Sequence, residues 1–247
     1  MKLFTYTLLF LLFSISIHAQ TMNVNYKSVE LNNSHLSYSV KASYPQVNFG
    51  PDALMGVRGI AGDINTFFDT TVSSVIKEFE HQVSELPVKS LDGHGSSLDI
   101  SSEAYVTNGS LLCSEVTVFT YLVQMAHPNT VLTTYNFKVN GEGPLTISSL
   151  FKSGSDYLNF ISSYCIKELT AKAVKEGYSD NTEMINSGAS PDEKNFSNWT
   201  VKDDSLNIIF NPYQAGPYVM GIQSVSIPLN ELTSMISSDG ALSFMLR

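Results

Sequence analysis

The stretch IAGDINTFFDTTVSSVIKEFEHQVSEL, residues 60–86, indicates the fold class most clearly. Its apolar residues recur at intervals of three and four, which places them along one side of a helix. We expect a long helix with Asp63 as its N-cap and Pro87 as its stop, packed through this side on a sheet. The apolar residues are Ile60, Ile64, Phe67, Phe68, Val72, Val75, Ile76, Phe79, Val83 and Leu86.

The segments around this helix have the composition of β-strands. Residues 24–44 read as extended chain with a polar turn at 32–34, and strand patterns follow at 98–106, 111–125 and 130–139. Asn108-Gly109 separates two of these strands, and this pair is typical of a type I′ hairpin turn. The sheet is therefore expected to be mostly antiparallel.

The C-terminal half repeats this mixture of helix and strand. We expect a second long helix at 156–174, an irregular segment at 179–196, a hairpin turning at 203–205, and a strand at 218–227 followed by a short helix from Pro228. The pattern predicts an α+β fold, a mostly antiparallel sheet with two long helices packed on it. The whole forms a single compact unit of two sub-regions.

The N-terminus has the features of a secretory leader. Lys2 precedes an apolar run from 3 to 17, and Ala19 ends a small-residue cleavage pattern, so we expect residues 1–19 to be removed. The later sequence holds no apolar run of the roughly 20 residues that a membrane-spanning helix needs. The sequence thus predicts an exported protein, periplasmic or extracellular; the alternative is a retained signal anchor.

The chain is acidic, with 14 Lys and Arg against 23 Asp and Glu and a formal net charge of −9. Loss of Lys2 with the leader would make this charge −10. Such a surface disfavours nucleic acid and favours basic partners, although the charge is also consistent with simple solubility.

Cys113 and Cys165 are the two cysteines of the chain. An exported protein can form a disulfide, which here would join the sheet to the second helix and contribute roughly 4 kcal/mol. Two buried free thiols are the alternative, because the sequence gives no distance between them.

Two turns rich in Pro, Gly, Asn and aromatic residues stand out, at 126–130 and 211–218. Proline ends a strand by removing a backbone donor, and rigid aromatic rings are favoured in binding surfaces. We therefore expect ligand-binding residues in these turns. The alternatives are that the tyrosine rings pack inward and that the histidine is structural. The candidate residues are His127, Asn129, Pro212, Tyr213, Pro217 and Tyr218.

Motifs for catalysis and metal binding are absent from the sequence. There is no Gly-x-Ser-x-Gly, His-Glu-x-x-His, Cys-x-x-Cys or phosphate-binding glycine loop. Ser-x-x-Lys occurs at Ser74 and Ser149, and Ser179-Asp180-Asn181 follows, but Lys-Thr-Gly is missing, so we interpret these matches as chance. The histidines are scattered, so we expect no metal site. Because the catalytic motifs are missing, we expect no enzyme, and we expect no cofactor.

Taken in order, several segments resemble a known family. They are Tyr44-Pro45-Gln46, Asn65, Tyr135-Asn136-Phe137, the run from 145 to 151, and the run from 206 to 232. The chain resembles the extracellular domain of RsiV-type anti-sigma factors and the non-catalytic N-terminal domain of PdaC-type peptidoglycan deacetylases. The resemblance implies a PdaC-like sub-region at 20–140 and an RsiV-like sub-region at 141–247.

The same resemblance implies a function. RsiV-type proteins recognise lysozyme, typically a basic enzyme, but this chain is expected to lack their membrane helix and sigma-binding segment. We therefore expect an exported binding module without catalysis, whose partner is a basic protein such as lysozyme, or peptidoglycan. The alternatives are a hydrolase or transferase without a known motif, which needs His, Ser and a carboxylate in one cleft, and a carbohydrate-binding module, marked by exposed coplanar Tyr rings or by Trp199.

Overall fold

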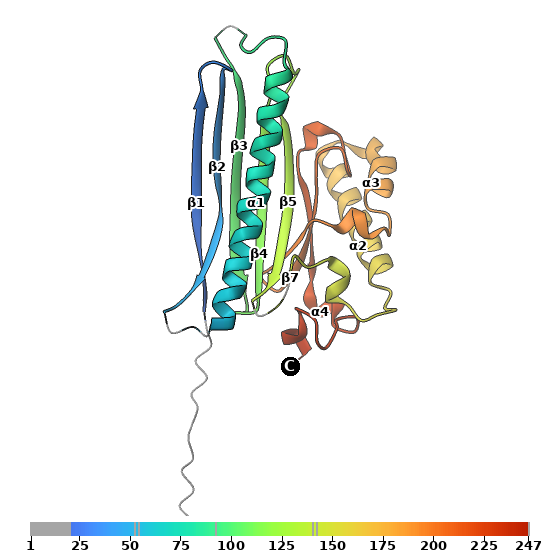
Figure 1. The fold of residues 1–247 in the computed structure, drawn as a ribbon. Helices are drawn as coiled ribbons and strands as arrows, with labels where there is room; N and C mark the ends of the chain where they lie inside the picture. The colour runs from blue at the N-terminus through green and yellow to red at the C-terminus, as the bar shows by residue number, and fades with distance from the viewer. Residues whose placement is uncertain are drawn as a thin grey trace, which may run out of the picture.

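The computed structural model describes residues 21–246 except 52, 54, 92, 140 and 142, so the expected leader lies outside the described residues. A five-stranded sheet carries the long helix α1 (Met55–Glu85) along one face, as Figure 1 shows. The predicted α+β class is confirmed. The strands of this sheet are β1 (Met22–Asn33), β2 (Tyr38–Phe49), β3 (Ser96–Thr107), β4 (Leu111–Tyr121) and β5 (Asn129–Lys138).

The five strands lie in the order in which they occur in the chain. All neighbouring pairs are antiparallel except β2 and β3, which run parallel over the short register from Tyr38–Ser96 to Ala42–Ile100. Parallel neighbours need a long crossover, and α1 supplies it. The mostly antiparallel sheet is therefore confirmed, with one parallel pair that follows from the position of α1.

Helix α1 packs on the sheet through the predicted apolar stripe. Its buried residues, Ala61, Ile64, Phe68, Val72, Ile76, Phe79 and Val83, share one core with the facing strands. The expected N-cap was wrong, because the helix begins at Met55 and Asp63 is an exposed interior residue. Ile60 and Ala61 pack into the core just before Asp63, so the helix already contacts the sheet at this point. The Lys89 ammonium donates to the carbonyls of Val83, Ser84 and Leu86 at the other end, a favourable place for a cation.

The two predicted hairpin turns have the backbone that their sequences favour. Asn108 and Gly109 have φ values of 49° and 64°, and Asp203 and Asp204 have 50° and 56°. Positive φ at both central residues is the signature of a type I′ turn. Both predictions are confirmed.

The C-terminal elements form a second layer against the opposite face of the sheet. Because side chains alternate along a strand, Leu112 faces α1 while Leu111 and Cys113 join the second core. Of the described helices, none is long and apolar enough to cross a membrane. The main elements of this layer are α2 (Tyr157–Glu176), α3 (Thr182–Gly188), β6 (Trp199–Lys202), β7 (Ser205–Phe210), β8 (Gln223–Pro228) and α4 (Leu229–Leu232), with short 3-10 turns such as η4 (Tyr218–Met220).

The second long helix is confirmed as α2, and two other expectations for this half were wrong. The segment 179–196 was expected to be irregular but contains α3, whose buried Ile185 packs into the second core. The strand expected over 218–227 begins only at Gln223, because residues 218–220 form η4. Tyr218 is a residue type favoured in strands, but here its ring packs on the 126–130 turn and its backbone forms η4.

Side chains of the large sheet bind the backbone of β6. The Trp199 amide donates to Thr134 Oγ1 (2.9 Å), and its carbonyl accepts from Asn136 Nδ2 (2.7 Å). The Val201 carbonyl accepts from Thr107 Oγ1 (2.5 Å). These bonds satisfy an edge strand that would otherwise keep unpaired backbone groups beneath the second layer.

The disulfide considered from the sequence is not formed in the structure, where Cys113 and Cys165 are free and fully buried. Cys113 lies on β4 and its Sγ accepts from the Val201 amide (3.4 Å), so it faces β6, whereas Cys165 packs on α2. Burial raises the pKa of each thiol to about 12. Both therefore act as apolar core residues that remain protonated.

Candidate binding site

The two predicted turns, separated by about ninety residues in the chain, meet in the structure. The Tyr218 hydroxyl donates to the Pro128 carbonyl (3.0 Å). The His127 ring lies 4.6 Å from the Tyr218 ring, and the Tyr213 ring lies 5.6 Å from it on centroid distances. The interplanar angles are 32° and 33°. We call His127, Tyr213 and Tyr218 the ring cluster.

Hydrogen bonds fix the second turn to the rest of the molecule. The Asn211 amide group accepts from the Leu132 N–H (2.8 Å) and donates to its carbonyl (2.9 Å), so it pairs with β5 as a short strand would. Gln214 Nε2 donates to the carbonyls of Gly188 (3.2 Å) and Asn195 (2.9 Å). Tyr213 has a φ of 69°, an uncommon conformation for a non-glycine residue, which these bonds hold in place.

The rings of the cluster are turned outward to different degrees. Tyr213 is 60% exposed, His127 is also exposed, and Tyr218 is half-buried beneath them. Asn129 is exposed at the start of β5, while Pro212 and Pro217 are half-buried. All six predicted residues therefore lie in the two facing turns, and Asn129 is also the first residue of β5.

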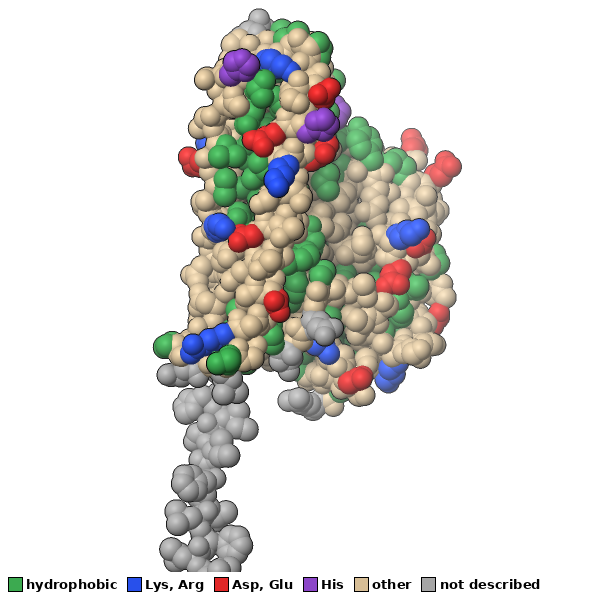
Figure 2. Space-filling view, in the orientation of Figure 1, with side chains coloured by type: hydrophobic (Ala, Val, Ile, Leu, Met, Phe, Trp, Pro, Cys, Tyr) green, Lys and Arg blue, Asp and Glu red, His purple; other side chains and the backbone are tan. Residues whose placement is uncertain are grey.

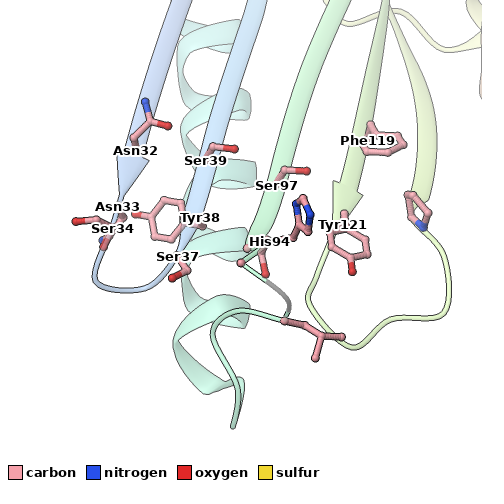
Figure 3. Close-up of a pocket in the computed structure, with 15 residues that line it drawn as sticks. Asn32, Asn33, Ser34, Ser37, Tyr38, Ser39, His94, Ser97, Phe119 and Tyr121 are labelled. Carbon is pink, nitrogen blue, oxygen red and sulfur yellow. The ribbon is translucent and has the colours of Figure 1, made fainter.

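A hollow of about 890 Å³ lies at the end of the large sheet (Figure 3). Pro128 belongs to its wall, which links it to the cluster. Its floor is a row of four side chains in register across β1 to β4, which we call the polar row: Asn32, Ser39, Ser97 and Tyr121. Phe119 lies two residues before Tyr121, on the same side of β4.

The sequence did not indicate the polar row. Ser39 and Ser97 face away from α1, since their neighbours Val40 and Leu98 belong to the α1 core. They become neighbours only through the parallel pairing of β2 and β3, which depends on where α1 returns the chain. Two clustered serine pairs, at 37 and 39 and at 96 and 97, are the one signal that the sequence held.

Two carboxylates lie directly opposite each other on the large sheet, near β6. Glu103 and Glu115 are directly opposite on β3 and β4, and Glu103 pairs with Lys202 (3.0 Å). Burial, together with the charge of Glu103, raises the pKa of the Glu115 carboxyl, which accepts a long hydrogen bond from Thr200 (3.4 Å). The sequence analysis did not identify this pair, because residues twelve apart meet only through the hairpin.

The Ser-x-x-Lys matches have structural surroundings. Ser74 donates to the Thr70 carbonyl within α1, and Ser149 donates to the Thr146 carbonyl. Lys152 donates to the carbonyl of Ser234. Among the described residues, no group of three or more His, Cys, Asp and Glu side chains could hold a metal ion.

Comparisons with known proteins define a class over part of the chain. Residues 148–230 match the family described as "Protein of unknown function (DUF3298)". The chain is similar to the peptidoglycan-N-acetylmuramic acid deacetylase PdaC of Bacillus subtilis (strain 168), at 31% identity over 111 residues. This alignment covers 45% of the chain but only 23% of the deacetylase. The findings support a DUF3298 and PdaC-like relationship, whereas the resemblance to RsiV-type proteins stays a prediction.

Solved structures show the same fold. A DUF3298 family protein from Pseudomonas aeruginosa PAO1 aligns with a TM-score of 0.62 at 10% identity, covering 87% of this chain and 94% of that one. A DUF3298 family member from Bacteroides fragilis NCTC 9343 aligns with a TM-score of 0.56 at 16% identity, covering 90% and 95%. The fold therefore extends well beyond the 148–230 match and includes the large sheet.

Proposed function

We propose that this chain is an exported, non-catalytic binding module that recognises a cell-wall-associated ligand through the ring cluster. The observation that carries the proposal is the convergence of His127, Tyr213 and Tyr218 from two distant turns, with Tyr213 60% exposed. Exposed aromatic rings on a rigid backbone bind with little loss of side-chain freedom. A tyrosine that served only the fold would be expected to bury its ring.

The cell-wall context comes from the similarity to PdaC, whose name states an action on peptidoglycan N-acetylmuramic acid. The chain matches a minor part of that protein, which is compatible with a module that has no chemistry of its own. The candidate ligands are a basic protein such as lysozyme, and peptidoglycan. The net charge of −9 favours encounter with a basic protein.

The charge acts as a general field. Figure 2 shows acidic and basic side chains scattered over the face that carries α1, without a large patch of one sign. A scattered charge accelerates encounter but does not by itself select a partner. We therefore assign recognition to the ring cluster and steering to the net charge.

The hydrolase and transferase alternatives need a cleft in which His, Ser and a carboxylate converge. The hollow holds His94 and several serines, but no Asp or Glu is among the described residues that line it. The proposal of a non-catalytic module rests on this composition together with the absence of catalytic motifs from the sequence.

Calorimetric titration of the purified protein tests the proposal. We expect binding to a basic lysozyme or to soluble peptidoglycan fragments, and binding that persists at about 0.5 M salt, where surface charge is screened. If binding to lysozyme disappears at high salt, that binding is non-specific electrostatic attraction, and lysozyme is not the recognised ligand. Failure to bind both ligands at both salt concentrations would contradict the proposal.

A further inference from the structure

Apart from His94, the described side chains that line the hollow carry no charge, and most of them offer hydrogen-bonding groups. Asn32, Ser39, Ser97 and Tyr121 offer one amide and three hydroxyl groups, which can both donate and accept. None of the described lining residues is Asp, Glu, Lys or Arg. This composition suits an uncharged ligand with many hydroxyl and amide groups, since a charged ligand would lose hydration there without gaining an ion pair.

Charged residues begin only in the next row of the sheet. Glu30, Lys41 and Asp99 stand side by side on β1, β2 and β3, so their charges alternate and largely compensate one another. Phe119 occupies the same row on β4 and adds its ring to that of Tyr121. This part of the hollow thus combines the rings of Phe119 and Tyr121 with neutral polar groups. Sugars present an apolar C–H face as well as hydroxyl groups, so they suit such a lining.

The polar row has the dimensions of an extended ligand. Four strands with a spacing of about 4.8 Å give a row roughly 14 Å long, which exceeds a single sugar ring. The row leads to Pro128, whose carbonyl accepts a hydrogen bond from the Tyr218 hydroxyl, so this end of the hollow adjoins the ring cluster. A linear chain could therefore contact both.

The walls of the hollow are held in place before any ligand arrives. The Ser96 amide donates to the Ser37 carbonyl (3.0 Å), and Ser96 Oγ accepts from the buried Val123 amide (3.1 Å). Gly95 lies so close to the β1–β2 turn that a Cβ there would be 1.7 Å from the Ser37 carbonyl oxygen. A preformed site avoids much of the entropy loss of binding.

From these four observations we infer that the hollow is a subsite for an uncharged glycan chain, with the polar row along the sugars and Phe119 and Tyr121 against their C–H faces. This inference rests on the proposed function and names one ligand class for it. A basic protein is disfavoured at this place, because the described lining residues offer no carboxylate for its lysines and arginines.

The test is calorimetric titration of the whole protein with chitohexaose, an uncharged oligomer of N-acetylglucosamine. Ser97→Val removes a hydroxyl from the polar row and keeps a side chain that suits a strand. Tyr121→Ala removes a ring. Ser101→Val is the matched control, because Ser101 is exposed on the same face of β3 but lies outside the hollow.

We expect the wild-type protein to bind chitohexaose with little salt dependence, and each hollow variant to raise Kd by about tenfold or more, while the control leaves Kd unchanged. If Tyr121→Ala lowers the melting temperature, its loss of affinity could come from misfolding. The Kd of Ser97→Val then decides whether the polar row binds the glycan. No wild-type binding, or equal binding by Ser97→Val and Ser101→Val, would overturn the glycan subsite. Lysozyme binding without chitohexaose binding would overturn it and leave the proposed function standing, whereas absence of binding to lysozyme, peptidoglycan fragments and chitohexaose would remove both.

Discussion

At the scale of residues, asparagine side chains repeatedly take the place of a missing strand. The Asn65 amide on α1 accepts from the Val47 N–H (2.7 Å) and donates to its carbonyl (2.9 Å), as Asn211 does with Leu132. Asn198 accepts from the Thr134 amide (3.0 Å). A primary amide carries both a donor and an acceptor, so it can pair with the exposed backbone of a strand.

We predict that Asn211→Ala lowers the free energy of unfolding by about 1–3 kcal/mol, because it leaves the Leu132 N–H and carbonyl without partners. It should also weaken ligand binding, since the turn that carries Tyr213 loses its attachment to β5. Urea unfolding measures the first effect. Asn25→Ala, at an exposed position on β1, is the control and should leave stability unchanged; equal stability of Asn211→Ala and wild type would contradict the assigned role.

The raised pKa of Glu115 predicts a pH-dependent stability. A carboxyl whose pKa is higher in the folded state keeps its proton up to a higher pH than in the unfolded chain. The free energy of unfolding therefore falls as pH rises from the unfolded pKa through the folded pKa. At pH 7, Glu115→Gln should therefore have a higher free energy of unfolding than wild type. The gain should be at most about 1 kcal/mol, because the site is only half-buried. The difference should vanish at about pH 3, where the carboxyl is protonated in both the folded and the unfolded state.

Urea unfolding at the two pH values measures this difference. Asp63→Asn, which removes an exposed carboxylate within α1, is the control and should change stability at neither pH. A loss of stability in Glu115→Gln at pH 7 would mean that its charge stabilises the contact between β3, β4 and β6.

At the scale of elements, the sequence predicted correctly those helices and turns whose formation depends only on their own residues. The stripe of α1 and the Asn108-Gly109 turn were predicted because helix period and positive φ are local properties. The strand expected at Tyr218 failed, because this ring packs on the 126–130 turn and the chain forms η4 there. Helix α3 was missed, since it buries chiefly Ile185 and so shows no apolar stripe.

The contact between α3 and the 211–217 turn gives a prediction at this scale. A Cβ at Gly188 would lie 1.8 Å from the Gln214 carbonyl oxygen, so Gly188→Ala should push the turn away and destabilise the protein by about 1–3 kcal/mol. Gly59→Ala is the matched control within α1, where nothing lies within 4 Å; it should raise stability by up to about 1 kcal/mol. Thermal unfolding measures both, and shifts of the same sign would contradict the packing described for Gly188.

At the scale of the whole molecule, the site depends on contacts that no local pattern encodes. The turns at 126–130 and 211–218 were both identified from their composition, but their meeting was not, because it requires β6 to be bound along β4 and β5. The hollow needs the parallel pairing of β2 with β3 as well. The sequence thus predicted residues of the ring cluster one at a time, and the structure added their arrangement and the neighbouring polar row.

The central claim is that the ring cluster is a binding surface. The most direct test compares Tyr213→Ala with wild type in two readouts. These are the affinity for the titrant that wild type binds, a basic lysozyme or soluble peptidoglycan fragments, and the melting temperature. We predict at least about a tenfold loss of affinity with a nearly unchanged melting temperature, because the ring is 60% exposed. Val174→Ala, at an exposed apolar position on α2, should change neither readout. A lower melting temperature with unchanged affinity would show that the ring serves the fold and would contradict the claim.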